Sequence, residues 1–191
     1  MRFLKVIILF AGFLSMVFPA DAQHWTVWYG VGLSNEMKAG PLTQWHFANG
    51  GVDYTIPASR WDFTIGAGLS TKGGLLRANY VQLEGNAGYR FLDLPYGFRL
   101  SALMGPFFGV RVADNRKDWV PFMPELKPCL FGWQAGFLLG FKFVALKIGY
   151  EQALTGYYDK SVSTQYVNAD GKPSFPTSKP HSLFIRLGFE F

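Results

Sequence analysis

The side chains that could take part in acid–base or metal chemistry are few and widely spaced. The 191-residue chain has three histidines, His24, His46 and His181, and a single cysteine, Cys129. A metal site needs three or four converging ligands, and a covalent hydrolase needs a nucleophile beside a base. The spacing of these residues matches neither arrangement, so the sequence predicts no catalytic residue, no metal site and no cofactor. A lone cysteine also excludes an internal disulfide.

The charged side chains follow a regular pattern, because they recur at alternate positions of apolar segments. In residues 80–91, Glu84 and Arg90 stand on the opposite parity to Val81, Leu83 and Tyr89. A β-strand places successive side chains on opposite faces. The pattern therefore predicts strands with one apolar and one polar face.

Eight segments show this alternation, at residues 24–34, 45–56, 60–70, 80–91, 98–112, 129–142, 145–154 and 181–191. The connections between them alternate in character: 35–44, 71–78, 113–128 and 155–180 are long or polar, whereas those near 57–59, 92–97 and 143–144 are short. Long loops on one rim and short turns on the other are typical of membrane barrels. We therefore expect an all-β fold, an eight-stranded antiparallel up-and-down transmembrane β-barrel.

The composition agrees with a membrane-facing surface. Charged residues make up 16% of the chain and aromatic residues 18%, against about 25% charged residues in a typical soluble domain. Tryptophan and tyrosine on the apolar face could form interfacial girdles. No Lys/Arg run could follow a phosphate backbone, which argues against a nucleic-acid partner.

The polar face is expected to line the barrel interior. It is rich in glycine, which suits crowded or bent strands, and an eight-stranded barrel is just wide enough to be filled by side chains. Buried charges must pair, since isolated buried ions are costly. We expect an ion-pair network in the lumen, formed by Asp62, Glu84, Arg90, Arg99, Arg111, Lys142, Lys147, Glu151, Arg186 and Glu190.

Residues 1–22 are predicted to be a cleaved signal peptide, which leaves 23–191 as the barrel domain. A basic start, an apolar run and a small-x-small site at Ala20-Asp21-Ala22 support this prediction. A helical membrane protein is the structural alternative, because Gly132, Gly136 and Gly140 form a GxxxG-like series. A spacing of four also falls on one face of a strand.

Several segments together resemble the small outer-membrane β-barrel proteins of Gram-negative bacteria, of the porin-family or OmpX-like type. The similar segments are GAGLSTKGG (66–74), NYVQLEGNAGYRF (79–91), GPFFGVRVAD (105–114) and LKIGYEQALTGYYD (146–159). The final LFIRLGFEF is similar to the terminal strand recognised by the outer-membrane assembly machinery, with Leu187, Phe189 and Phe191 as the expected signal. The resemblance implies an outer-membrane location, with membrane lipids and lipopolysaccharide as neighbours.

The role of such a barrel stays open at the level of sequence. We expect a non-enzymatic protein that stabilises the envelope or binds a partner through the loops 113–128 and 155–180. The alternatives are an enzyme that modifies lipid A by acyl transfer or deacylation, and a narrow pore for small solutes. The sequence names no ligand or loop partner.

Overall fold

The alternating segments form eight strands in the structure, a computed structural model that describes residues 23–35, 44–73, 77–115, 125–158 and 179–191. The predicted signal peptide and much of the predicted loops lie outside these residues. The strands are β1 (His24–Asn35), β2 (Gln44–Ala58), β3 (Trp61–Gly73), β4 (Arg77–Leu94), β5 (Phe98–Asp114), β6 (Cys129–Phe141), β7 (Val144–Ala153) and β8 (His181–Glu190).

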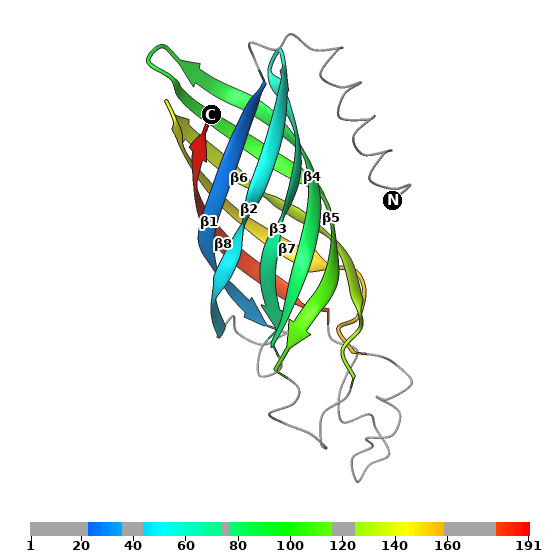
Figure 1. Ribbon diagram of the computed structural model, residues 1–191. Coiled ribbons are helices and arrows are strands. Elements are labelled where there is room, and N and C mark those ends of the chain that lie inside the picture. The colour runs from blue at the N-terminus through cyan, green and yellow to red at the C-terminus, as the bar shows by residue number, and fades with distance from the viewer. Residues whose placement is uncertain (1–22, 36–43, 74–76, 116–124, 159–178) are drawn as a thin grey trace, which may run out of the picture.

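Each strand pairs antiparallel with its sequence neighbours, and β1 pairs with β8 to close the barrel (Figure 1). The predicted eight-stranded up-and-down barrel is therefore confirmed. The helical alternative is wrong for Gly132, Gly136 and Gly140, because all three lie in β6 and pair with β5 and β7. Within the described ranges, no helix is long and apolar enough to cross a membrane.

The two faces of the sheet separate as expected, with the apolar face outward. Trp25 and Leu83 expose 54% and 53% of their surface. Side chains of the opposite parity are buried inside the barrel, among them Thr26, Gln82 and Gln134. This arrangement is the reverse of a soluble barrel, whose apolar side chains would fill the interior.

Glycines on the inner face make room for large lumen side chains. A Cβ atom at Gly188 would lie 2.4 Å from the ring of Trp28, and one at Gly132 would lie 2.6 Å from the ring of Phe107. Because Trp28 and Phe107 project inward from neighbouring strands, a larger residue at either glycine would collide with a ring. These glycines thus serve the dense packing that the narrow lumen requires.

The connections define two different rims. At the turn-side rim, tight turns at 59–60, 95–97 and 142–143 join β2–β3, β4–β5 and β6–β7, and the C-terminus lies at the same end (Figure 1). The other four connections form the loop-side rim. The expectation of a loop over 71–78 is wrong, because β3 continues to Gly73 and β4 begins at Arg77.

Candidate functional site in the barrel lumen

Six charged side chains meet at the middle of the lumen, and we call them the lumen network. They are Asp53 of β2, Lys72 of β3, Glu84 of β4, Lys147 and Glu151 of β7, and Arg186 of β8. All six are buried, with exposed fractions between 1% and 8%. Alternation along five strands brings these residues to the same enclosed space.

The network is continuous from one side of the lumen to the other. Arg186 joins two carboxylates, donating from Nη1 to Glu84 Oε1 at 2.6 Å and from Nη2 to Glu151 Oε1 at 2.9 Å. Lys147 Nζ lies 3.1 Å from Glu84 Oε2 and 3.3 Å from Asp53 Oδ2. Lys72 completes the chain by an ion pair with Glu151.

The six formal charges cancel, since three cations face three carboxylates. A buried ion is tolerated only when it is paired and its remaining hydrogen-bonding positions are filled. Amide and hydroxyl groups fill several of them: Gln82 donates to Glu151 at 3.1 Å, Gln134 donates to Glu84, and Ser182 donates to Glu151 at 3.4 Å.

Each cation of the lumen network also faces an aromatic ring. Lys72 Nζ lies 4.4 Å from the ring centre of Phe107, and the Arg186 guanidinium lies 4.4 Å from that of Phe184. Lys147 Nζ lies 5.7 Å from the ring centre of Trp28. Cation–π contacts of this kind are strongest where water is excluded, so the rings contribute to holding the cations in the lumen.

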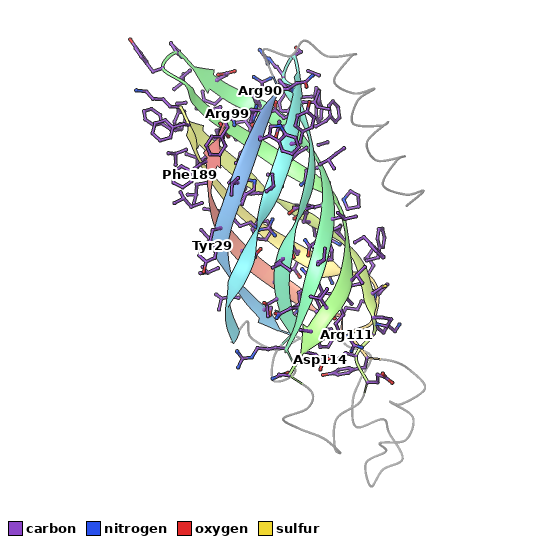
Figure 2. The ribbon with its side chains drawn as sticks, viewed as in Figure 1. Tyr29, Arg90, Arg99, Arg111, Asp114 and Phe189 are labelled. Carbon is purple, nitrogen blue, oxygen red and sulfur yellow. The ribbon has the colours of Figure 1, made fainter. Side chains whose placement is uncertain are left out.

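The turn-side end of the lumen holds a second, less buried set of ion pairs. Arg99 pairs with Glu190, and Arg90 Nε lies 3.1 Å from Asp62 Oδ2. Figure 2 shows Arg90 and Arg99 at this rim, with Arg111 and Asp114 at the opposite one. A cavity of about 20 Å³ lies between this rim and the lumen network, which is room for about one water molecule.

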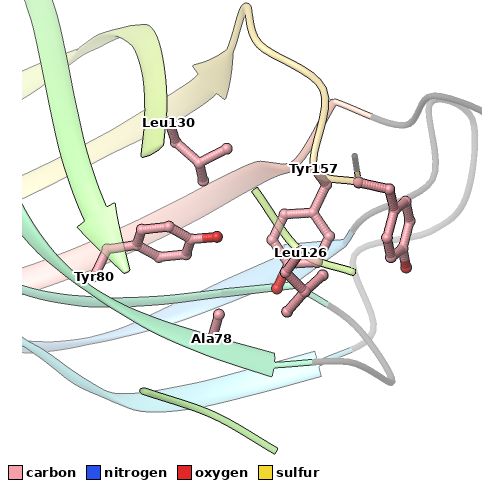
Figure 3. Packing of buried hydrophobic residues seen from close by; sticks show 6 residues of the cluster. Ala78, Tyr80, Leu126, Leu130 and Tyr157 are labelled. Carbon is pink, nitrogen blue, oxygen red and sulfur yellow. The ribbon is translucent and has the colours of Figure 1, made fainter. Parts of the chain in front are cut away.

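The loop-side end is closed by apolar packing, which we call the loop-side cluster. Figure 3 shows its members, Ala78, Tyr80, Leu126, Leu130, Tyr157 and Tyr158. Segments on both sides of the long loops meet here, because Lys127 N donates to Tyr157 O at 2.9 Å and Leu126 bridges to Tyr158. The Tyr157 hydroxyl donates to the Lys72 carbonyl at 2.9 Å. This hydrogen bond connects the loop-side cluster to β3, the strand that carries Lys72 of the lumen network.

The predicted lumen residues fall into three groups. Glu84, Lys147, Glu151 and Arg186 belong to the lumen network. A second group lies at the rims and consists of Asp62, Arg90, Arg99 and Glu190 on the turn side and Arg111 on the loop side.

Lys142 forms the third group and does not line the lumen. It is exposed in the β6–β7 turn, where its φ of 54° ends the alternation of β6. Its ammonium lies 5.6 Å from the ring centre of Phe141, on the outside of the barrel. The expectation that Lys142 joins an internal network is therefore corrected.

Sequence reasoning missed Lys72 as a lumen residue, because the segment 71–78 was assigned to a loop. The even parity of Gly66, Gly68 and Ser70, continued to Lys72, is the signal that could have placed it. Asp53 of β2 joins the network through Lys147, at 3.3 Å from the Lys147 ammonium.

The candidate assembly residues lie on the outside of β8. Leu187, Phe189 and Phe191 expose 48%, 47% and 77% of their surface. Phe191 also closes the barrel seam, because its backbone N and O exchange hydrogen bonds with Trp25 at 2.8 and 3.1 Å. The last residue of the chain thus has a structural contact in addition to any recognition signal.

The histidines are distributed over both rims. His24 lies beside Arg99 and Glu190 at the turn side, and His181 packs 6.2 Å from the ring of Tyr150 near the loop side. His46 belongs to β2, close to the loop-side rim. Among the residues described, no group of three His, Cys, Asp or Glu side chains could hold a metal ion.

Comparison with solved structures finds other barrels of similar extent. The N-terminal β-barrel domain of Pseudomonas aeruginosa OprF is 12% identical, with a TM-score of 0.48, and the match covers 89% of this chain and 98% of that one. Ail, the attachment invasion locus protein of Yersinia pestis, is 11% identical, with a TM-score of 0.43 and coverages of 88% and 97%. No family model and no curated protein matches the sequence.

Proposed function

We propose that this protein spans the outer membrane of a Gram-negative bacterium as a closed, non-enzymatic barrel. In this proposal it supports the envelope or presents its loop-side rim to partners at the cell surface. The observation that carries the proposal is the inverted arrangement of the barrel: apolar side chains cover the outside, and a neutral ion network fills the inside.

The outer surface supports a membrane location. The shortest strands, β7 and β8, have 10 residues each, and a tilted membrane strand needs about 9–11. Aromatic pairs stand toward the turn side, Trp25 with Tyr54 and Trp61 with Tyr89, at 4.7 and 5.1 Å between ring centres. Such residues favour the boundary between lipid and water.

The interior supports a barrel that passes no solute. Ion pairs cross the middle of the lumen, and the loop-side cluster packs between them and the loop-side rim. In planar bilayers we therefore expect no stable conductance from the refolded mature chain. A heat-modifiable gel band and a β-rich circular dichroism spectrum would establish that the inserted protein is folded. Conductance steps of nanosiemens size from protein that passes both controls would contradict the closed lumen.

The positions of the histidines exclude only a joint reaction of His24 and His181, which lie at opposite rims. His24 also contacts Arg99 and Glu190. Mass spectrometry of lipid A from cells with and without the protein tests the non-enzymatic role. We expect identical acylation patterns, and an acyl chain gained or lost only in the producing cells would favour the enzyme alternative.

The exposed C-terminal aromatic supports recognition by the outer-membrane assembly machinery. We expect Phe191→Asp to lower the amount of folded protein in the outer membrane several-fold. Phe143→Asp is the matched control, because Phe143 is an exposed aromatic at the same rim, 62% exposed, but lies within a turn. Equal outer-membrane levels of the two variants would remove the special role of the terminal residue.

A further inference from the structure

The hairpin formed by β4 and β5 continues past the neighbouring β2–β3 turn at the turn-side rim, because Trp61, the first residue of β3, pairs with Tyr89. β4 and β5 are the longest strands of the barrel, with 18 and 17 residues. Tyr89 of β4 pairs with Trp61 in the aromatic girdle, and β4 then continues for five residues to Leu94. At about 3.3 Å per residue along a tilted strand, the tip lies about 10 Å beyond the girdle.

The projecting tip carries four exposed apolar side chains and one exposed carboxylate, Asp93, which pairs with Arg90 at 3.1 Å. Phe91, Leu92, Leu94 and Tyr96 expose 49%, 37%, 46% and 87% of their surface. A β-bulge interrupts the pairing of β4 with β5 between Arg90 and Leu92, where Phe91 is the extra residue of β4. The outward Phe91 is therefore followed directly by a second outward apolar residue, Leu92. Because of this bulge, Leu92 and Leu94 return to the outer face in spite of their even numbers.

The apolar surface of the tip is continuous with the lipid-facing surface of the barrel. Leu94 pairs with Phe98, and Phe98 pairs with Phe141 of β6. Leu92 pairs with Leu100, which pairs with Leu139 in the same way. Along these two rows of paired residues, no polar side chain lies between the hairpin tip and the outer surface that the membrane covers in the proposed function.

The neighbouring β2–β3 turn at the same rim has a different character. Its exposed residues, Ser59 and Arg60, are polar, as expected of a turn in water. A shallow groove of about 300 Å³ lies where this turn meets the hairpin, and it is lined by Ser59, Arg60, Arg90, Phe91, Leu92 and Asp93. Exposed cations, Arg60 and Lys142, therefore lie on either side of the apolar tip.

Apolar side chains flanked by cations match the boundary of a phospholipid leaflet, where acyl chains meet anionic phosphates. We propose that the β4–β5 tip, residues 91–97, inserts into the headgroup region of the leaflet at the turn-side rim. The membrane-covered belt is then deeper at β4–β6 than at β1–β3, so the barrel is tilted in the bilayer. This inference rests on the membrane location proposed above.

Spin labels on the full mature barrel in vesicles of phosphatidylethanolamine and phosphatidylglycerol test the inference. In a Cys129→Ser background, single cysteines replace Leu94 or Tyr96 at the tip, with Leu92→Cys as a further tip variant if either misfolds. Arg60→Cys is the matched control at the neighbouring turn, and Leu83→Cys marks the outward middle of β4. Collision of each label with oxygen and with a water-soluble nickel chelate reports its depth.

We expect the labels at 94 and 96 to collide several-fold more with oxygen than with nickel, relative to the label at 60. Tip labels that collide with nickel as often as the label at 60 would overturn the inference. Tip labels shielded from both reagents in native outer membranes, but open to nickel in lipid vesicles, would identify a protein partner and also overturn it. A label at 83 that is open to nickel would instead contradict the membrane-spanning barrel itself.

Discussion

The lumen network and the turn-side rim contain the same kinds of ion pair but differ in their access to solvent. Lys147 and Glu151 each expose 2% of their side chains, whereas Arg90 and Arg99 at the rim expose 19% and 21%. In the centre, Arg186 and Lys147 each contact two carboxylates. At the rim, Arg99 pairs with Glu190, and Arg90 pairs with Asp62 and with Asp93, whose side chain is 60% exposed.

This difference determines what each region contributes. When a partly exposed ion pair forms, each charge replaces contacts with water by a contact with its partner, so the net gain in folding free energy is small. A buried pair has lost its water, so removing one partner leaves an uncompensated charge in a medium of low dielectric constant. The centre should therefore control the stability of the barrel, whereas the rim should tolerate substitution.

The largest expected effect comes from replacing Arg186, which joins Glu84 to Glu151. Arg186→Met leaves the network with two cations and three carboxylates, and we expect a loss of about 3–5 kcal/mol in the free energy of unfolding. Arg90→Met at the rim is the matched variant and should cost about 1 kcal/mol or less. Urea unfolding in lipid vesicles, followed by tryptophan fluorescence, measures both.

A compensating variant separates charge from packing in this experiment. Arg186→Met combined with Glu84→Gln restores neutrality and leaves two complete ion pairs, Lys72 with Glu151 and Lys147 with Asp53. We expect the double variant to recover a substantial part of the lost stability. If it is less stable than Arg186→Met alone, the loss arises from packing and the contrast between centre and rim is not electrostatic.

A second test compares coupling energies in the two regions. A double-mutant cycle with Lys72→Met and Glu151→Gln should give a coupling of about 2 kcal/mol, within the range for residues in contact. The same cycle with Arg90→Met and Asp62→Asn should give a smaller coupling, about 1 kcal/mol, because Arg90 is partly exposed to water. Equal couplings would show that burial does not distinguish the two regions.

The sequence predicted the strands well, because period-two alternation follows directly from strand geometry. The predicted segment 129–142 ends within one residue of β6, and 98–112 ends within two of β5. The errors occur where alternation stops. Lys142 continues the parity of β6 but lies in a turn, and Lys72 lies in a strand although its neighbours Thr71 and Gly73 suggest a hairpin tip.

The partners within the lumen could not be predicted from the sequence. Parity places Glu84 and Arg186 inside the barrel, but their contact depends on the register of strands that are 102 residues apart in the chain. The loop-side cluster was missed for another reason. Leu126 and Tyr157 lie in segments assigned to loops, and only the folded chain brings them together over Tyr80.

A smaller effect is expected where the loop-side cluster meets the network. Tyr157→Phe removes the hydroxyl that donates to the Lys72 carbonyl and keeps the ring in the cluster. The expected cost is about 1 kcal/mol, the usual net value of one hydrogen bond. Tyr158→Phe is the control, because its ring packs against Tyr157 in the same cluster. A loss of 3 kcal/mol or more, as estimated for a broken buried ion pair, would show that this bond positions Lys72 for Glu151.

The smallest expected effect is the response to salt. Mobile ions screen charges that water can reach, and at about 1 M ionic strength the Debye length falls to about 3 Å. The stability difference between wild type and Arg90→Met should therefore shrink in 1 M salt by a few tenths of a kcal/mol. The difference between wild type and Arg186→Met should stay unchanged, because the side chains of the lumen network are 2–7% exposed. If salt changed both of these stability differences by the same amount, ions would have to enter the centre of the lumen. The barrel would then be open from the turn side.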